Sequence, residues 1–396
     1  MSRSGRAAMT IGTVTAAFSV GVEEEFLLAH PSTARLEPVS GAVIEAAGRM
    51  GVQLFKELTT AQVETNTSVC WNTRELRQDL LGLRSAAATA AWHAGARLLA
   101  AGAPIHDEPP APLADSARYQ RMGREFGMLA ADHGVCGCHV HVGLADRETA
   151  ILVGNHLRPW LPTLLALTAN SAIHRGRDTG YASWRTVMWS RWPCAGPPPY
   201  FTSAGHFDSV VATMLDSGAI LDEGMIYWDI RPSVHQPTIE IRVSDVPSTV
   251  DETVLLAALV RGLVATAVRE LDTREPARVS TEVLRAAYWR SARDGIRGQS
   301  LDPVTLRRTM FADRLAELIR HVAGALEESG DLHEVAALAN TVLSRGNGAL
   351  RQRRAFARRG EVADVVDVIA SSTLRGRPSP AFGAPLPGNH AASGRT

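Results

Sequence analysis

Three consecutive carboxylates near the start of the chain lie inside a hydrophobic stretch. The carboxylates are Glu23, Glu24 and Glu25, and the surrounding apolar residues are Phe18, Val20, Val22, Phe26, Leu27 and Leu28. Such a stretch is typical of a β-strand, in which Glu23 and Glu25 point to one face and Glu24 to the other. At a rise of about 3.3 Å per residue, the two carboxylates on one face are roughly 7 Å apart and repel each other unless a cation neutralises them. The stretch predicts a divalent-metal site, and the alternative is a solvated edge strand with a run of charge.

A second pair of carboxylates follows in residues 52–58 and 62–69. Both segments have an extended pattern, and the short polar connection between them predicts an antiparallel pair of strands. Glu57 lies near the end of the first segment and Glu64 near the start of the second. We expect both to join the metal site.

Two histidines share one face of a third predicted strand, residues 136–143. Alternation places His139 and His141 on the same side of it. This H-x-H pattern also resembles the zinc-binding strand of amidohydrolases, which makes a zinc-dependent hydrolase the alternative enzyme. Such a site needs further histidines and an aspartate at later strand ends. The number of glutamates favours Mg²⁺ over Zn²⁺.

A later predicted hairpin, residues 225–232 and 238–243, carries charges of both signs. Glu240 and Arg242 share one face of its second strand, and Arg231 lies on the first. An arginine beside a glutamate in a sheet is most often an ordinary cross-strand ion pair. Together with the earlier strands, however, these residues complete a set suited to hard cations such as Mg²⁺ or Mn²⁺.

Several Mg²⁺ ions together with arginines suit the transfer of a phosphoryl group from a triphosphate. The sequence contains neither a P-loop motif nor a G-x-G-x-x-G motif after a strand. If ATP binds, carboxylates on the sheet and arginines must therefore hold it through metal.

Residues 174–200 are rich in arginine and aromatic residues. Arg185 and Arg191 are candidates here for binding phosphate or a substrate carboxylate. A long irregular segment within a compact domain is more often functional than not. The alternative is that its aromatic residues only anchor a loop to the core. Nucleic-acid binding is disfavoured because the formal net charge is zero.

The remaining pattern predicts an α+β fold whose strands precede a helical C-terminal part beginning near residue 250. Apolar spacing predicts helices over residues 42–50, 74–99, 114–132, 147–172, 205–216, 254–268, 281–293, 304–327, 332–345, 349–358 and 362–374. Thr73 and Asp146 are the expected N-caps of two of them. Residues 98–105 could form another strand. The helical part has no titratable cluster, so we expect it to serve as scaffold or as a homodimer surface.

The bulk composition predicts a soluble cytoplasmic protein that does not act on membranes. Of the 396 residues, 45% are hydrophobic and 21% charged, and the four cysteines are too few for a disulfide framework. We expect residues 16–374 to form one catalytic domain between disordered segments 1–15 and 375–396.

In five places, in order along the chain, the sequence resembles the glutamate–cysteine ligase type 2 family of carboxylate–amine ligases. The matching features are Gly21 to Phe26, Glu57 and Glu64 followed by Thr67, Gly137 to Gly143, Tyr181 to Pro193, and Tyr227 to Asp245. The resemblance implies a glutamine-synthetase-like catalytic fold, a curved antiparallel β-sheet bowl with surrounding helices. ATP and Mg²⁺ or Mn²⁺ would lie inside the bowl.

The implied reaction joins a small-molecule carboxylate to an amine through an acyl phosphate, with glutamate and cysteine as candidate substrates and weak glutamate–cysteine ligase activity. The resemblance implies metal binding by Glu23, Glu25, Glu57, Glu64, His139 and Glu240. It makes Arg242 a phosphate contact, with Arg231, Arg185 and Arg191 as further candidates for phosphate or substrate and His141 as a supporting residue. Residues 174–200 would form a substrate loop over the bowl. A non-catalytic protein that keeps the fold and binds metal or nucleotide is a third interpretation.

Overall fold

The computed structural model describes residues 18–374. The two terminal segments that we expect to be disordered, 1–15 and 375–396, lie outside the described residues. The main sheet runs in the order β2-β3-β1-β5-β9-β8, β4 also pairs with β1, and all of its pairings are antiparallel. Its strands are β1 (Val20–Ala29), β2 (Phe55–Lys56), β3 (Gln62–Asn66), β4 (Arg97–Leu99), β5 (Gly137–Gly143), β8 (Ile230–Pro232) and β9 (Thr238–Asp245). Two short hairpins are formed by β6 (Ile173–His174) with β7 (Arg177–Asp178), and by β10 (Gln299–Leu301) with β11 (Arg308–Met310).

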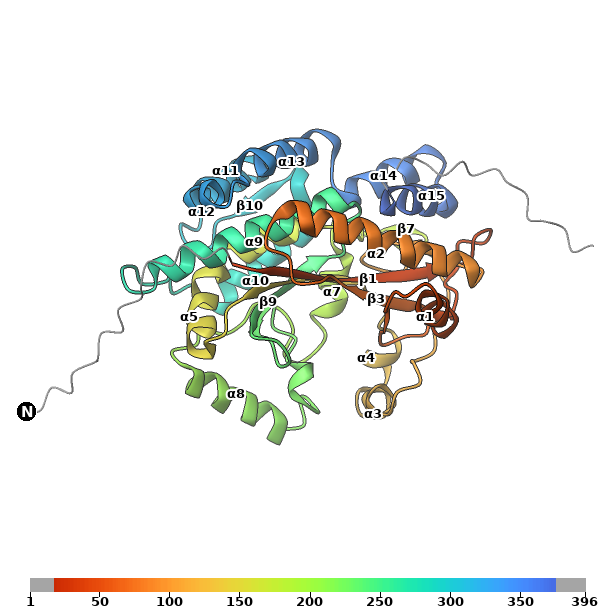
Figure 1. Ribbon diagram of the computed structural model, residues 1–396, viewed down its shortest axis with the longest axis horizontal. Helices are drawn as coiled ribbons and strands as arrows, with labels where there is room; N and C mark the ends of the chain where they lie inside the picture. The colour runs from red at the N-terminus through yellow and green to blue at the C-terminus, as the bar shows by residue number, and fades with distance from the viewer. Residues whose placement is uncertain (1–17, 375–396) are drawn as a thin grey trace, which may run out of the picture.

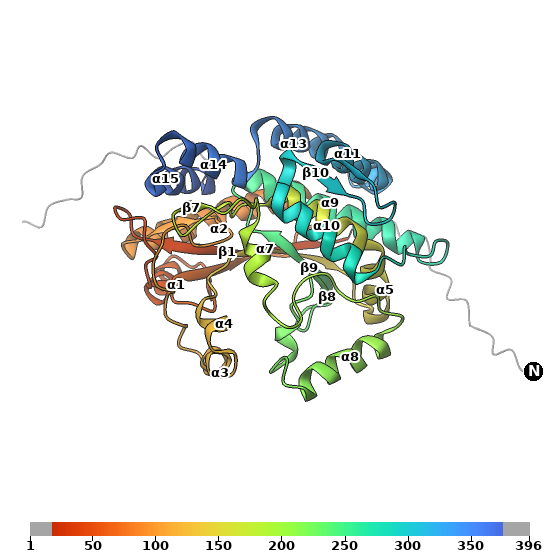
Figure 2. The same cartoon turned by 180° about the vertical axis from the view of Figure 1, so that it is seen from behind.

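Helices surround this sheet, and most of the C-terminal third is helical. They are α1 (Ser40–Arg49), α2 (Thr73–His93), α3 (Ala117–Phe126), α4 (Met128–Ala131), α5 (Arg147–Leu157), α6 (Leu161–Thr168), α7 (Trp184–Trp189), α8 (Ala204–Asp216), α9 (Val250–Glu270), α10 (Thr281–Asp294), α11 (Phe311–His321), α12 (Ala323–Glu328), α13 (Leu332–Arg345), α14 (Gly348–Arg359) and α15 (Val362–Thr373). Helices α2 and α9 lie along one side of the sheet, and α3, α4 and α8 lie on the other side (Figures 1 and 2). The predicted α+β class with an antiparallel sheet is confirmed.

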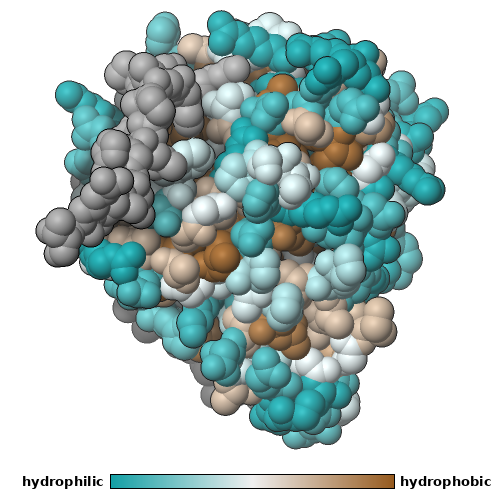
Figure 3. All heavy atoms as spheres, turned by 90° about the vertical axis from the view of Figure 1, so that its right-hand side faces the viewer, coloured by the Kyte–Doolittle hydropathy of each residue, from teal (hydrophilic) through white to brown (hydrophobic). Residues whose placement is uncertain are grey.

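The hydrophobic core lies between the sheet and the covering helices. Alternate residues of the central strands, such as Val22, Val140 and Ile241, pack in one cluster with the apolar face of α9. This alternation leaves the opposite face free for polar residues. On the side of the molecule shown in Figure 3, hydrophobic residues form separate patches within a mostly hydrophilic surface. No helix between residues 18 and 374 is long and apolar enough to cross a membrane.

Several predicted elements differ from the observed ones for identifiable reasons. The predicted helix 114–132 is divided at Gly127, whose φ of 53° and ψ of −125° interrupt the helix. The expected kink near Trp160 is a 3₁₀ turn, Arg158–Trp160, between α5 and α6. Asp146 caps α5 as predicted, but the cap of α2 is Asn72 and not Thr73.

The prediction of a continuous helix over residues 304–327 was wrong in its first part. The Asp302 carboxylate accepts hydrogen bonds from the Val304 N–H and the Thr305 hydroxyl, and Leu306 has a φ of 60°. These local bonds fix the turn of the β10–β11 hairpin, so the helix begins only at Phe311. The strands predicted over residues 225–232 and 98–105 are also shorter than expected.

Candidate active site

The polar residues of the inner face meet because the register of the sheet aligns them across neighbouring strands. Glu25 on β1 lies opposite Glu64 on β3, and Glu23 lies opposite His139 on β5. His141 in turn lies opposite Glu240 on β9. Facing residues on adjacent strands have Cβ atoms about 4.5–5.5 Å apart, so their side chains can share a ligand. Glu23 and Glu25 therefore lie on the polar inner face of β1, as the sequence predicts.

One group on this face consists of three carboxylates. Glu25, Glu57 and Glu64 each place an oxygen within 4.8 Å of the others. Burial and the nearby charge of Glu25 raise the pKa of Glu57 to about 7. Burial and the charge of Glu57 raise the pKa of Glu64 well above its usual value. Three carboxylates at this separation favour either bound protons or a cation between them.

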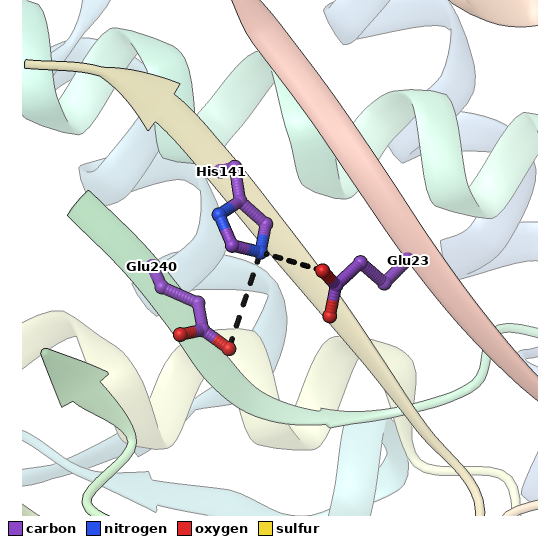
Figure 4. Close-up of side chains that lie close together, drawn as sticks. All are labelled: Glu23, His141 and Glu240. Carbon is purple, nitrogen blue, oxygen red and sulfur yellow. Dashed lines mark ion pairs between the residues drawn. The ribbon is translucent and has the colours of Figure 1, made fainter. Parts of the chain in front are cut away.

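A second group combines two carboxylates with an imidazole (Figure 4). The Nε2 atom of His141 lies 3.2 Å from an oxygen of Glu23 and 4.0 Å from an oxygen of Glu240. Although burial opposes the shift, hydrogen bonds with His139 and His141 hold the pKa of Glu23 below its usual range. This geometry adds His141 to the residues that could bind a metal directly, whereas the sequence suggested only a supporting role.

His139 lies between the two groups. Its Nδ1 atom is 3.0 Å from Glu23, and its Nε2 atom is 3.6 Å from an oxygen of Glu25. This Nε2 atom is buried without a hydrogen-bond partner among the described residues. A buried nitrogen facing a carboxylate at a distance too long for a hydrogen bond suits a cation bound by both.

Two arginines, one on β8 and one on β9, form ion pairs with Glu240. Arg231 Nε donates to Glu240 across 2.8 Å, and Arg242 Nη1 donates to the other oxygen of the same carboxylate. Burial alone would raise the pKa of Glu240, but these two guanidinium groups hold it well below its usual value. A β-bulge in the β5–β9 pairing places Arg242 near His139, so Arg242 Nη1 lies 3.3 Å from His139 Nδ1.

Arg185 is a further candidate, because its guanidinium is buried and lies over the ring of Trp189. The residue is only 2% exposed, and its Nε atom has no hydrogen-bond partner among residues 18–374. A Cβ atom at position 137 would lie 2.5 Å from Arg185 Nη2, so this close approach requires Gly137. The Gly137 N–H itself donates to Glu25 across 2.6 Å. Arg185 therefore lies beside the carboxylate groups and could bind an anionic ligand there.

The buried carboxylate of Asp245 fixes the start of α7 and with it the position of Arg185. Asp245 accepts hydrogen bonds from the hydroxyls of Ser171 and Ser183 at 2.7 and 2.8 Å. The Ser171 hydroxyl accepts the Arg185 N–H at 2.9 Å, and Ser183 caps α7. Asp245 is thus a positioning residue for the guanidinium.

We expect Asp245→Asn to lower turnover about tenfold to 100-fold, because an amide cannot accept all three hydrogen bonds that the carboxylate accepts from the Ser171 and Ser183 hydroxyls and from the Asn170 N–H. Steady-state kinetics should show a loss in kcat, and circular dichroism should show an intact fold. The variant Asp367→Asn, at an exposed carboxylate on α15, serves as a control. Equal kinetics for the two variants would contradict the positioning role.

The structure does not bring Arg191 into the site. Its guanidinium pairs with Asp132 at 3.2 Å, and its side chain is 40% exposed. The sequence placed Arg191 with the other arginines only because they share one segment. Along a segment that contains two strands, a helix and turns, nearness in sequence does not specify which side chains point inward.

Glu24 points away from the site, as alternation predicts, and it pairs with a residue that sequence reasoning missed. Arg84 donates to both oxygens of Glu24, at 2.8 and 2.5 Å, and both side chains are at most 1% exposed. A signal was present in the sequence, because Arg84 lies on the same helical stripe as Leu76 and Leu80. An arginine on a buried stripe needs an acidic partner.

Solved structures with this fold include two ligases. A glutamate–cysteine ligase from Francisella tularensis, crystallised in complex with AMP, superposes with a TM-score of 0.65 at 12% identity, covering 92% of this chain and 90% of the other. A bifunctional glutathione synthetase from Pasteurella multocida gives a TM-score of 0.64 at 14% identity, covering 91% of this chain and 52% of the other. At such low identity these structures show the fold alone.

Sequence comparison identifies the class of enzyme and the protein family. Fold, site and relatives define an ATP-dependent carboxylate–amine ligase. The chain belongs to glutamate–cysteine ligase family 2, whose sequence profile matches residues 19–368. A protein of Nocardia farcinica, provisionally named glutamate–cysteine ligase 2-1, is 52% identical over 92% of this chain and 95% of its own length. A relative from Mycolicibacterium smegmatis, provisionally named glutamate–cysteine ligase 2-3, is 51% identical over 89% of this chain and 98% of its own. The hydrolase interpretation is not favoured.

Proposed function

We propose that this ligase forms an amide bond between the side-chain carboxylate of glutamate and the amine of cysteine. The provisional names of the relatives support this pair of substrates. The observation that carries the proposal is the joint arrangement of the carboxylate groups and the buried arginines on one face of the sheet. Carboxylates for metal and arginines for phosphate are the two components that phosphoryl transfer requires.

The proposed metal is Mg²⁺ or Mn²⁺, and the residues present fit such ions. Glu25, Glu57 and Glu64 offer three oxygens, and Glu23, His141 and Glu240 offer a second set. Oxygen-rich sites with one imidazole suit these hard cations. The unpartnered Nε2 atom of His139 adds a donor between the two sets. When bound, the ions would neutralise the charge that develops on the phosphates.

The proposed reaction has two chemical steps. An oxygen of the substrate carboxylate attacks the γ-phosphorus, and the bond to ADP breaks. The amine then attacks the acyl carbon, phosphate leaves with the former carboxylate oxygen, and the amine loses a proton. Arg242 and Arg231 are positioned to stabilise charge on the transferring phosphate, and Arg185 is positioned to hold an anionic group of the substrate. No covalent enzyme intermediate is needed.

Metal binding should become tighter as the pH rises. The raised pKa values of Glu57 and Glu64 mean that the folded protein holds protons that the unfolded chain releases above about pH 4.5. The contribution of these two carboxyl groups to the stability of the metal-free protein should therefore fall between pH 5 and pH 8, by up to about 1.4 kcal/mol per pH unit for each extra proton. At the higher pH a divalent cation replaces the protons.

Thermal unfolding with and without Mg²⁺ at pH 6 and pH 8 tests this dependence. We expect a larger increase in Tm from Mg²⁺ at pH 8, and Glu57→Gln should remove most of the difference. An equal increase at both pH values would argue against metal binding by this group.

The proposed substrates are tested by measuring ADP release over a panel of acids and amines. Purified protein with ATP and Mg²⁺ should release ADP when glutamate and cysteine are both present, with γ-glutamylcysteine detected by mass spectrometry. ADP release with other pairs of acid and amine, but not with glutamate and cysteine, would contradict the proposed substrates and still support the proposed reaction type. Amide hydrolysis without ADP release would overturn both.

A further inference from the structure

The irregular connection between α6 and β6 is buried, although connecting segments normally run over the surface of a protein. Residues 169–172 form this connection, and each is 0% exposed. Because water cannot reach their backbone N–H and C=O groups, these groups need partners within the protein. The connection contains Ser171, whose hydroxyl joins the Asp245 carboxylate to the Arg185 N–H. Whatever fixes the connection therefore also affects the position of Arg185.

Gln352 on α14 supplies several of these partners. Its side-chain oxygen accepts the N–H groups of Ala172 and Ile173 at 2.9 and 3.2 Å. Its amide nitrogen donates to the backbone oxygen and to the side-chain oxygen of Asn170 at 2.7 and 2.9 Å. A glutamine amide has two acceptor positions and two donor hydrogens, so all four are used here. Since Gln352 is only 1% exposed, water does not compete for them.

Asn170 connects Gln352 to the carboxylate that positions Arg185. The Asn170 N–H donates to Asp245 across 2.8 Å. Asp245 accepts the Ser171 hydroxyl, which itself accepts the N–H of Arg185. A continuous series of buried hydrogen bonds therefore runs from α14 to the first turn of α7, where the side chain of Arg185 begins.

The start of α14 also lies unusually close to the connection. A Cβ atom at position 348 would lie 1.9 Å from Asn170 Oδ1, so this approach requires Gly348. The side chain of Asn347, the N-cap of α14, donates to the carbonyl groups of Ala166 and Leu167 at the end of α6, at 3.1 and 3.3 Å. Helix α14 thus holds the connection at its beginning and along its length.

We propose that Gln352 is a positioning residue for catalysis, which acts through Asn170 and Asp245 to hold Arg185 in the active site. The inference rests on the proposed function, in which Arg185 holds an anionic group of the substrate. It gives α14 a role beyond the scaffold that the sequence predicts for the C-terminal helices. A displacement of about 1 Å, caused far from the reacting groups, can slow a reaction roughly 100-fold.

Two substitutions of similar size test the role of Gln352. Gln352→Glu keeps an oxygen that accepts the N–H groups of Ala172 and Ile173, and it loses both donors toward Asn170. Gln352→Met removes all four hydrogen bonds without adding a charge. Gln299→Glu, at an exposed position on β10, is the matched control.

We expect both substitutions of Gln352 to lower the kcat for ADP release about tenfold to 100-fold, with the KM for ATP within about twofold of wild type. Hydrogen exchange followed by mass spectrometry should become faster in a peptide covering residues 183–190 and stay unchanged in a peptide covering residues 147–157. In an Arg185→Lys protein the same substitutions should cause little further loss of kcat, because their effect passes through the guanidinium. Gln299→Glu should match wild type in every measurement.

The outcomes separate this inference from the proposed function. Normal kcat and unchanged exchange of residues 183–190 in both Gln352 variants would overturn the positioning role and leave the reaction in place. Losses of kcat that multiply in the double variants, or failure of both single variants to fold, would also overturn it, because Gln352 would then act independently of Arg185. If wild type releases no ADP with any substrate pair, the proposed function fails, whereas faster exchange confined to residues 183–190 would still support the coupling between α14 and α7.

Discussion

Replacing Glu25 by glutamine should lower ATP-dependent turnover at least about 100-fold and leave the fold intact. Glu25 contacts several parts of the site. It belongs to the three-carboxylate group, lies 3.6 Å from the unpartnered His139 nitrogen and accepts the Gly137 N–H. The amide retains the size of the side chain but loses the charge that a cation requires. ADP release and calorimetric Mg²⁺ binding should both show the loss.

The control for this experiment is Glu45→Gln, which removes an exposed carboxylate from helix α1. It should behave as wild type in both assays. Normal ADP release by Glu25→Gln would remove the metal role from β1. Lost activity with unchanged Mg²⁺ affinity would mean that Glu25 does not bind the metal. Its role would then be to accept the Gly137 N–H and so to position the neighbouring residues.

Replacing the adjacent residue, Glu24, should lower the stability of the fold and leave Mg²⁺ binding unchanged, because Glu24 has a structural role. Glu24→Gln leaves the Arg84 charge buried without its partner, and breaking a buried pair in this way costs about 3–5 kcal/mol. The free energy of unfolding from urea titration should fall by that amount. Mg²⁺ affinity of the remaining folded protein should stay near that of wild type.

The double variant Glu24→Met with Arg84→Met is the matched control, since apolar replacement of both partners removes the uncompensated charge. It should recover much of the stability lost in Glu24→Gln, although Arg84 also donates to the Pro247 carbonyl and to Thr253. A fully stable Glu24→Gln protein would contradict the structural role.

Residues on strands were predicted well because alternation is a local property. The opposite directions of Glu23 and Glu24, and the shared face of His139 and His141, follow from the two-residue period of a strand. The shared face of Glu240 and Arg242 follows from the same period, whereas Glu57, which lies just beyond β2, was chosen with Glu64 because the two lie near the facing ends of neighbouring segments. The antiparallel sheet could therefore be predicted from short segments, because the residues expected to point inward are all suited to binding metal or phosphate.

Features that depend on tertiary contacts were not predictable in this way. The sequence does not show that a β-bulge brings Arg242 beside His139, or that Arg191 turns to Asp132. It gave His141 a supporting role because the distance to Glu240 depends on strand register. The Arg84–Glu24 pair joins a helix to a strand 60 residues apart. Such pairings arise from packing, which periodicity alone does not encode.

The most direct test of the central claim follows the oxygen atoms of the substrate. Glutamate labelled with ¹⁸O in its side-chain carboxylate is incubated with the protein, ATP, Mg²⁺ and cysteine, and the released phosphate is analysed by mass spectrometry. Activation of the carboxylate as an acyl phosphate predicts one ¹⁸O atom in each phosphate formed with the amide product. Amide product with unlabelled phosphate would contradict the account.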